Sequence, residues 1–217
     1  MNVLLVNAPS NGIYYKMGLK LPPLGVAYLA AYLRKDGKHS VDIIDMNAQP
    51  IKLQDIPWRD WDIVGISGDT SRHNKVLEIA AYAKEASRIV VTGGYHVTFL
   101  DEDVLRTGNA DYVVRGEGEE IFAELVDALA DGGGVSKVNG ISYLDADGNI
   151  VRALLNEYAL HDAKRDHMVG HKGLPKLLWA AVALVGGPFG RWQSVVEHQM
   201  RGLRRLYLKM HIAKLII

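Results

Sequence analysis

The chain has 217 residues, balanced charges and a hydrophobic share of 48%, which is enough for one well-buried domain and a smaller extension. The formal net charge of zero gives no reason to expect nucleic acid as a partner. Because the sequence contains no cysteine, disulfides, thiolate metal sites and cysteine-ligated iron–sulfur clusters are excluded from these residues.

Five short apolar runs alternate with helix-like segments in the first part of the chain. The runs span residues 2–6, 40–44, 62–66, 88–92 and 111–114. Each ends in a polar or glycine-rich turn, which is typical of strands buried on both faces. Helices are expected from Pro22-Pro23, after Ser71 and after Glu119. The alternation predicts a five-stranded parallel sheet with helices on both faces.

A small hairpin is expected to close this domain. Val138 to Tyr143 and Asn149 to Arg152 flank Asp145-Ala-Asp-Gly148, and Asp-Gly favours turns with positive φ. The pattern changes beyond about residue 155. We therefore divide the chain into an α/β domain over residues 1–155 and a basic helical extension over residues 156–217.

Four loops follow the carboxyl ends of the predicted strands, where open parallel sheets bind their ligands. They span residues 7–24, 67–74, 93–99 and 115–120, and all are rich in glycine or small polar residues. Such residues let backbone N–H groups approach a ligand, although a single glycine at such a position serves equally well to make the turn. The fingerprints of dinucleotide sites and P-loops are both missing.

The motifs in these loops form an ordered set. They are Pro22-Pro-Leu-Gly-Val-Ala-Tyr-Leu-Ala-Ala-Tyr-Leu33, Val64-Gly-Ile-Ser67, Gly93-Gly-Tyr-His-Val-Thr98 and Arg115-Gly-Glu-Gly-Glu-Glu120. In order and spacing the set resembles the N-terminal B12-binding domain of cobalamin-dependent radical SAM proteins. The resemblance covers roughly residues 1–152. It implies a flavodoxin-like, Rossmann-like fold with cobalamin lying across the strand ends.

The same resemblance implies which residues contact the cofactor. The implied contacts are Ser67, Gly68, Gly93 and Gly94 in a slot for the nucleotide tail; Gly116, Glu117, Gly118 and Glu119 beside that slot; Pro9, Pro22 and Pro23 at the corrin ring; Thr70 and Ser71, with Arg72, near the lower face of the cobalt; and Asp69, Tyr95, His96 and Thr98 as further contacts.

Two absences refine what the resemblance implies. The loop over residues 7–24 contains no histidine, so the Asp-x-His-x-x-Gly motif of other B12 domains is missing and base-off cobalamin without a histidine ligand from this loop is expected. The Cys-x-x-x-Cys-x-x-Cys motif of radical SAM proteins is missing too, so no iron–sulfur cluster is expected and this chain alone is not expected to cleave SAM. A separate radical SAM or methyltransferase protein is the expected partner, and no side chain is expected to act as a catalyst or metal ligand.

Several titratable side chains in these loops also have a purely structural interpretation. His96 either touches the corrin or its amides or is satisfied by backbone groups at the strand end. His73, at a helix start, is more often solvated than ligating. Glu117 and Glu119 fall at the first turn of a helix, whose dipole they favour. Asp69 is either a helix cap or a ligand contact.

The predicted extension differs in charge from the domain. From residue 160 onward there are ten basic residues against three acidic ones, interleaved with apolar residues. A basic amphipathic helix of this kind lies on an anionic membrane surface, docks on a partner or folds back over its own domain. The sequence does not open with a signal-peptide pattern, and no run reaches the roughly 18 apolar residues of a spanning helix. A cytoplasmic protein, with peripheral membrane contact through the extension, is therefore expected.

The function predicted from these features is that of a cobalamin-binding protein or accessory module, with methyl-transfer chemistry implied by the resemblance alone. Two alternatives stay open. One is a degenerate, ligand-free B12-like domain that acts as a protein- or membrane-interaction module. The other is a flavin or nucleotide in the same crevice, because a fold does not fix its ligand.

Overall fold

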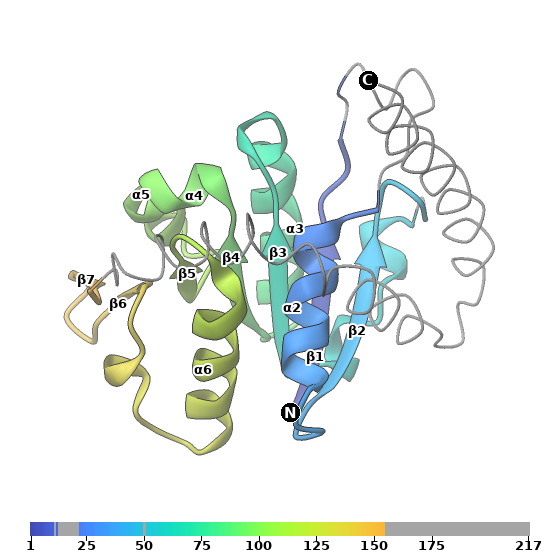
Figure 1. Ribbon diagram of the computed structural model, residues 1–217. Helices are drawn as coiled ribbons and strands as arrows, with labels where there is room; N and C mark the ends of the chain where they lie inside the picture. The colour runs from blue at the N-terminus through green and yellow to red at the C-terminus, as the bar shows by residue number, and fades with distance from the viewer. Residues whose placement is uncertain (11, 13–21, 50, 155–217) are drawn as a thin grey trace, which may run out of the picture.

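The computed structural model describes residues 1–10, 12, 22–49 and 51–154, which form a single twisted sheet covered by helices (Figure 1). The sheet has seven strands in the order β2-β1-β3-β4-β5-β6-β7. The strands are β1 (Asn2–Asn7), β2 (Ser40–Asp45), β3 (Ile63–Ser67), β4 (Ile89–Gly93), β5 (Tyr112–Val114), β6 (Ile141–Leu144) and β7 (Ile150–Arg152). The first five run parallel, as the sequence predicts, and β6 and β7 are antiparallel.

Helices cover both faces of the sheet. They are α2 (Leu24–Arg34), α3 (His73–Glu85), α4 (Tyr95–Phe99), α5 (Asp101–Arg106) and α6 (Gly118–Ala130), with short 3-10 turns at Leu53–Asp55, Trp58–Asp60, Thr70–Arg72 and Val135–Lys137. One core unites α2 and α6 with strand residues such as Leu5 and Val91. The second core unites α3, α4 and α5 with the alternate strand residues, such as Val64 and Val90. Strand alternation therefore assigns each strand side chain to one of two layers.

The hairpin at the end of the domain is part of the sheet. Its first strand pairs with β5, and the backbone N–H of Arg115 donates to the carbonyl of Gly140 at 2.8 Å. Side chains reinforce this pairing, because the Ser142 hydroxyl and the Arg152 guanidinium both donate to the carboxylate of Asp101 on α5. The sheet thus extends by two antiparallel strands beyond the five that the strand–helix alternation predicts.

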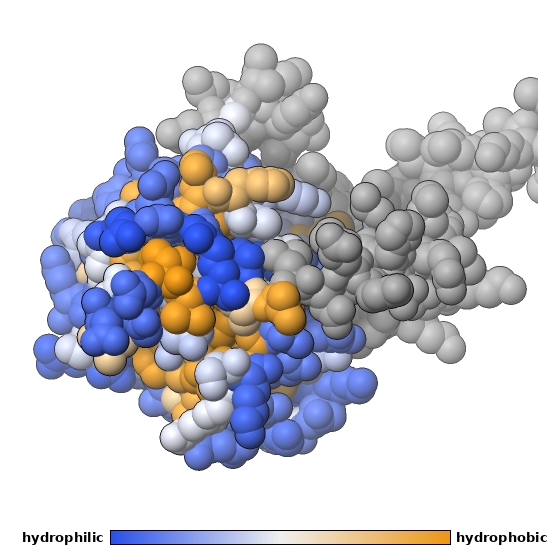
Figure 2. Space-filling model, turned by 90° about the vertical axis from the view of Figure 1, so that its left-hand side faces the viewer, coloured by the Kyte–Doolittle hydropathy of each residue, from blue (hydrophilic) through white to orange (hydrophobic). Residues whose placement is uncertain are grey.

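The β7 edge of the sheet carries apolar surface, visible as the orange area surrounded by blue in Figure 2. Leu144 at the end of β6 and Leu154 just after β7 are exposed hydrophobic residues of this edge, and Leu154 is 81% exposed. Because β7 has only three residues, it offers little backbone for pairing with another strand. The chain continues from this edge beyond residue 154.

The order of the strands reverses at β1. The chain goes from β1 outward to β2 and then returns to place β3 on the other side of β1. The connections to α2 and α3 therefore leave the sheet on opposite faces, which opens a crevice at the carboxyl ends of β1 and β3.

The predicted extension over residues 156–217 lies outside the described residues, as do most of the residues that connect β1 to α2. Among the described helices, none is long and apolar enough to cross a membrane.

Candidate functional site at the carboxyl ends of the strands

A cavity of about 610 Å³ lies between the sheet and the pair of helices α2 and α6, and it opens at the carboxyl ends of the strands. Its floor is formed by Leu5, Gly65 and Val91, which are register partners on β1, β3 and β4. Its opposite wall includes Leu29 of α2 and Phe122 of α6. A volume of this size is typical of sites for small molecules and cofactors.

Gly65 lowers the floor at the centre of the sheet. A Cβ atom at this position would lie 2.8 Å from Cδ2 of Leu5 and 3.1 Å from Cζ of Phe122. A side chain here would therefore have to displace one of these neighbours. An isolated glycine inside an apolar strand often marks such a close approach, so the run over residues 62–66 already carried a signal for this position.

The entrance of the cavity lies two residues nearer the carboxyl ends of β3 and β4. There Ser67 pairs with Gly93, and Gly93 pairs with Val114. A Cβ atom at Gly93 would find its nearest neighbours at 3.8 Å, on Val114, which is ordinary contact. Gly93 therefore leaves space that a larger side chain would fill.

Gly68 and Gly94 line the same cavity but for a different reason. Gly94 has φ of +114°, and a Cβ atom there would lie 2.5 Å from the carbonyl oxygen of Gly68. A Cβ atom on Gly68 would lie 2.4 Å from Cγ2 of Val76. These two glycines let the loops after β3 and β4 touch each other and α3, so they shape the entrance through the backbone.

Polar and aromatic side chains surround the entrance. Thr98 connects two of its loops, because its hydroxyl donates to the carbonyl of Gly94 at 3.0 Å and accepts from the N–H of Gly116 at 3.2 Å. Tyr95 and Phe99 line the entrance from α4 and are 82% and 81% exposed. The entrance therefore combines hydrogen-bonding groups with exposed aromatic rings.

Two carboxylates line the entrance from the start of α6. They belong to Glu117, which is exposed, and Glu119, which is partly buried. Glu119 lies in the first turn of α6 and Glu117 immediately precedes the helix, as the sequence predicts, so both favour the positive end of the helix dipole. Their oxygens are hydrogen-bond acceptors for a ligand at the entrance.

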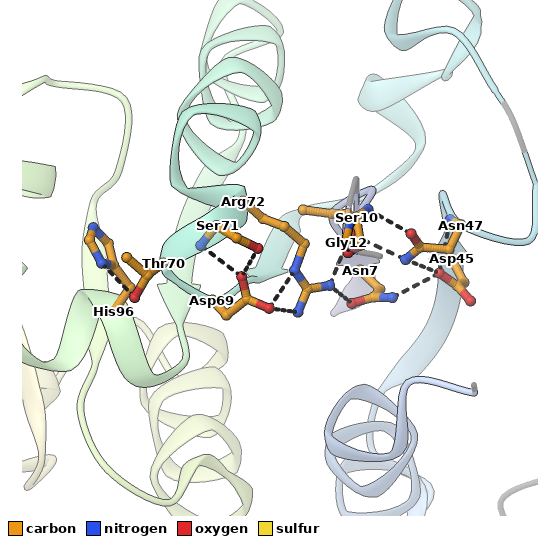
Figure 3. Close-up of polar contacts among 11 residues, drawn as sticks. Asn7, Ser10, Gly12, Asp45, Asn47, Asp69, Thr70, Ser71, Arg72 and His96 are labelled. Carbon is orange, nitrogen blue, oxygen red and sulfur yellow. Dashed lines mark hydrogen bonds and ion pairs between the residues drawn. The ribbon is translucent and has the colours of Figure 1, made fainter. Parts of the chain in front are cut away.

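An Arg72-centred network joins the loops after β1 and β3 (Figure 3). The guanidinium donates to Asp69 at 3.0 Å, to the side-chain carbonyl of Asn7 at 3.0 Å and to the backbone carbonyl of Ala8 at 3.1 Å. Burial by itself would raise the pKa of Asp69, but hydrogen bonds from Ser71 and Arg72 outweigh it and hold that pKa below its usual value. An ionised carboxylate therefore helps to join the end of β1 to the loop after β3.

The network continues to the end of β2. The Asn7 amide donates to Asp45 at 2.8 Å, and the Asn47 amide donates to Asp45 at 3.1 Å and to the carbonyl of Ala8 at 3.3 Å. The N–H of Ser10 in turn donates to the side-chain oxygen of Asn47 at 2.6 Å. The first residues of the loop after β1 are thus held by Asn47, which follows β2, and by Arg72, which follows β3 (Figure 3).

The two histidines form a separate cluster. The ring centroids of His73 and His96 are 4.2 Å apart, and Nδ1 of His96 is hydrogen-bonded to the Thr70 hydroxyl at 3.2 Å. Burial and, secondly, the nearby His96 lower the pKa of His73. In the described part of the chain, no group of three or more histidine, aspartate or glutamate side chains could hold a metal ion. Neither histidine is among the residues that line the cavity.

The cavity brings together most of the residues expected at the cofactor. Those that line it are Ser67, Gly68, Asp69, Gly93, Gly94, Tyr95, Thr98, Gly116, Glu117, Gly118 and Glu119. Those that do not are Pro9, Pro22, Pro23, Thr70, Ser71 and His96. Asp69 also accepts the N–H of Ser71 at 2.9 Å and so acts as a helix cap, one of its two expected roles.

The cavity also has lining residues that the sequence interpretation did not single out. They are Leu5, Gly25, Val26, Leu29, Gly65, Val91, Phe99 and Phe122, among others. Most are apolar residues of strands and helices, where a pattern predicts only burial. Their contribution to a cavity depends on which strands and helices meet.

Comparison with known proteins gives a consistent result. The family model described as "B12 binding domain" matches residues 11–126. An uncharacterized methyltransferase of Pyrococcus horikoshii, PH0819, is 42% identical over 151 residues, which is 66% of this chain and 32% of that protein. The anaerobic magnesium-protoporphyrin IX monomethyl ester cyclase of Synechocystis is 31% identical over 66% of this chain and 30% of that protein. The chain thus spans about a third of the length of these curated relatives.

Solved structures share the fold. The cobalamin-dependent S-adenosylmethionine radical enzyme OxsB, solved with aqua-cobalamin and S-adenosylmethionine bound, superposes with a TM-score of 0.59 at 24% identity. The match covers 71% of this chain and 22% of OxsB. The architecture of the described domain is therefore that of a known three-dimensional fold.

Proposed function

Because the chain belongs to the B12-binding domain family, as its ordered motifs predict, we propose that it holds cobalamin with the corrin ring across the carboxyl ends of the strands and the nucleotide tail in the cavity. The whole chain then acts as a cobalamin-binding protein or accessory module, related to the proteins that join such a domain to radical SAM or methyltransferase parts.

The residues of the cavity fit this ligand. We base the proposal on the cavity, whose lining extends from the small residues Ser67 and Gly93 at the entrance to Gly65 on the floor. In this proposal the nucleotide tail with its flat base enters the cavity of about 610 Å³, and the much larger corrin ring stays outside. The corrin ring is proposed to lie outside the strand ends, where open parallel sheets bind their ligands.

Polar groups at the entrance suit the hydrophilic parts of the ligand. The carboxylates of Glu117 and Glu119 can accept hydrogen bonds from a ribose hydroxyl or a corrin amide. The Arg72 network joins the end of β1 to the loop after β3, so the groups that it holds need little reorganisation on binding. The bound cofactor would supply a cobalt ion able to carry a methyl group, while the protein binds and orients it.

The six expected contacts outside the cavity lining, Pro9, Pro22, Pro23, Thr70, Ser71 and His96, belong in this proposal to the area beside the corrin ring. The tail is proposed to bind base-off. In support, the sequence from residue 7 to residue 24 contains no histidine, and His73 and His96 lie outside the cavity lining.

The decisive experiment is a titration of the purified full-length protein with hydroxocobalamin. A stoichiometric coloured complex whose absorption spectrum shows the tail base off the cobalt is the expected result. Cobinamide, which lacks the tail, is the matched control and should bind more weakly. Nitrogen coupling from a histidine in the cobalt(II) EPR signal, or a spectrum with the tail base still on the cobalt, would refute the ligation proposed here.

Binding measurements on the same purified protein also test the two alternative functions. Tight binding of a flavin or nucleotide in place of hydroxocobalamin would favour a different ligand in the crevice. Failure to bind any of them would favour a ligand-free interaction module. In either case the cobalamin proposal would be wrong.

The role of residues 156–217 is proposed from sequence alone. We propose a cytoplasmic protein whose basic extension contacts anionic membranes or a separate radical SAM or methyltransferase protein. The full-length protein should then float with phosphatidylserine-containing vesicles and less with neutral ones. Equal flotation, or none, together with failure to bind a partner, would contradict this role.

A further inference from the structure

The inner part of the cavity presents only apolar side chains to its occupant. They belong to Leu5, Val26, Leu29, Val91 and Phe122, with Gly65 between them. All of these except Leu29 are buried, and Leu29 is half-buried against the same core. Apart from Thr92 within β4, the polar lining residues lie at or beyond the carboxyl ends of the strands; they are Ser67, Asp69, Arg72, Tyr95, Thr98, Glu117 and Glu119.

The side chain of Thr92, on β4 beside the floor, points away from the cavity. Thr92 follows Val91 on β4, and its hydroxyl is buried without a partner in the described residues. Because strand side chains alternate, Thr92 points to the same side of the sheet as Val90, toward α3. The inner cavity therefore gains no hydrogen-bonding side chain from β4.

The backbone adds no free acceptor there. The strand carbonyls of β1, β3 and β4 face neighbouring strands in the parallel ladder, and those of α2 and α6 are engaged within their helices except in the last turns, which lie at the end away from the entrance. The unpaired N–H groups of α2 and α6 lie in their first turns, at the entrance end of the cavity. An amino group placed in the inner cavity would therefore find no acceptor.

We propose that this cavity selects cobamides by the base at the end of their tail, accepting dimethylbenzimidazole and rejecting adenine. The inference rests on the proposed function, because it requires the tail to enter base-off. Dimethylbenzimidazole presents a hydrocarbon edge with two methyl groups, which suits apolar walls. Adenine presents an exocyclic amino group and additional ring nitrogens, which lose their water without gaining partners.

The expected size of the selection follows from the cost of one unpaired buried polar group. The dissociation constant of the adenine-containing cobamide should be at least about tenfold higher than that of cobalamin. Adenine is the weaker base and leaves cobalt more easily, so base-off binding by itself favours the adenine form. A preference for cobalamin would therefore come from the cavity and not from the cobalt.

A matched pair of variants tests whether the floor is responsible. Val91→Thr places a hydroxyl in the inner cavity and should reduce the discrimination several-fold, because the amino group gains an acceptor. Val90→Thr is the control, since Val90 is equally buried on the same strand but faces the other core. It should leave the ratio of dissociation constants unchanged.

The experiment titrates full-length protein with hydroxocobalamin, its adenine-containing analogue and a cobamide with a phenolic base, which cannot coordinate cobalt. Cobalamin and the phenolic cobamide should both bind at least about tenfold more tightly than the adenine form. Equal binding of the three, or the same change in both valine variants, would overturn the selectivity while leaving cobalamin binding intact. Absence of binding by all three would overturn the proposed function and this inference with it.

Discussion

Two neighbouring glycines at the entrance should respond to substitution in opposite ways. Gly93 has an ordinary backbone conformation, and a Cβ atom there meets nothing closer than 3.8 Å. Gly94 has φ of +114°, and a Cβ atom added there would lie 2.5 Å from the carbonyl oxygen of Gly68. We predict that Gly93→Val lowers the affinity for cobalamin with little loss of stability, and that Gly94→Ala destabilises the fold.

The magnitudes follow from the two environments. Valine is favourable in a strand, so at position 93 it should leave the stability of the fold nearly unchanged. It should instead lower the affinity for cobalamin, because the ligand must share the cavity with three additional carbon atoms. Overfilling a packed site costs about 1–3 kcal/mol, so the dissociation constant should rise by roughly 5-fold to 150-fold. Alanine at position 94 must adopt a strained backbone conformation, and the free energy of unfolding should fall by about 1–3 kcal/mol or more.

Urea unfolding followed by circular dichroism measures the stability of each variant, and absorption titration with hydroxocobalamin measures its affinity. The wild-type protein is the reference for both. Wild-type affinity in a stably folded Gly93→Val protein would show that the tail does not pass over β4. Equal destabilisation by the two substitutions would refute the distinction between them.

Three further perturbations test the contacts around this site. Arg72→Lys keeps the charge but loses the planar guanidinium that contacts both Asp69 and Asn7, so the free energy of unfolding measured in urea should fall by about 1–3 kcal/mol. Arg106→Lys, in an exposed ion pair on one helix, is the control and should lower it by less than about 0.5 kcal/mol. Burial would raise the pKa of Asp101, but hydrogen bonds from Arg152 and Ser142 hold that pKa below its usual value. The ionised carboxylate therefore stabilises the fold above about pH 4, and this stabilisation is lost as the pH falls through the pKa of the folded state. The stability difference between wild type and Asp101→Asn should therefore shrink on acidification, and a constant difference would contradict this. Burial and His96 lower the pKa of His73, so stability should decline as the pH falls below about 6.5, and His96→Ala should shift the NMR titration of His73 to higher pH.

Local patterns in the sequence predict most of the fold. The five apolar runs are the five parallel strands, with ends displaced by at most one residue. The helices α2, α3 and α6 begin where prolines, polar caps and acidic residues predict them, whereas α4 and α5 were not predicted. These features depend on residues close together in the chain, so they are readable without knowing the fold. The four loops at the carboxyl ends follow directly, because parallel strands end on one edge.

The position of the hairpin in the sheet is not predicted by local patterns. Its two strands are predicted, but its pairing with β5 is reinforced by Asp101, which lies 41 residues from Ser142 and 51 residues from Arg152. A turn signal specifies that two strands meet each other. It does not specify which edge they join.

Composition and local patterns are enough to establish the family, the strands, the glycine-rich loops and the absence of cysteine chemistry in these residues, since each is a property of neighbouring residues or of composition. They do not show that Gly93 leaves space while Gly94 permits contact, that Arg72 reaches Asn7, or that Leu29 and Phe122 form the wall of a cavity. Cavities and hydrogen-bond networks depend on strand order and register. These bring together residues that are far apart in the chain, and the apolar pattern of each element fixes only that a face is buried.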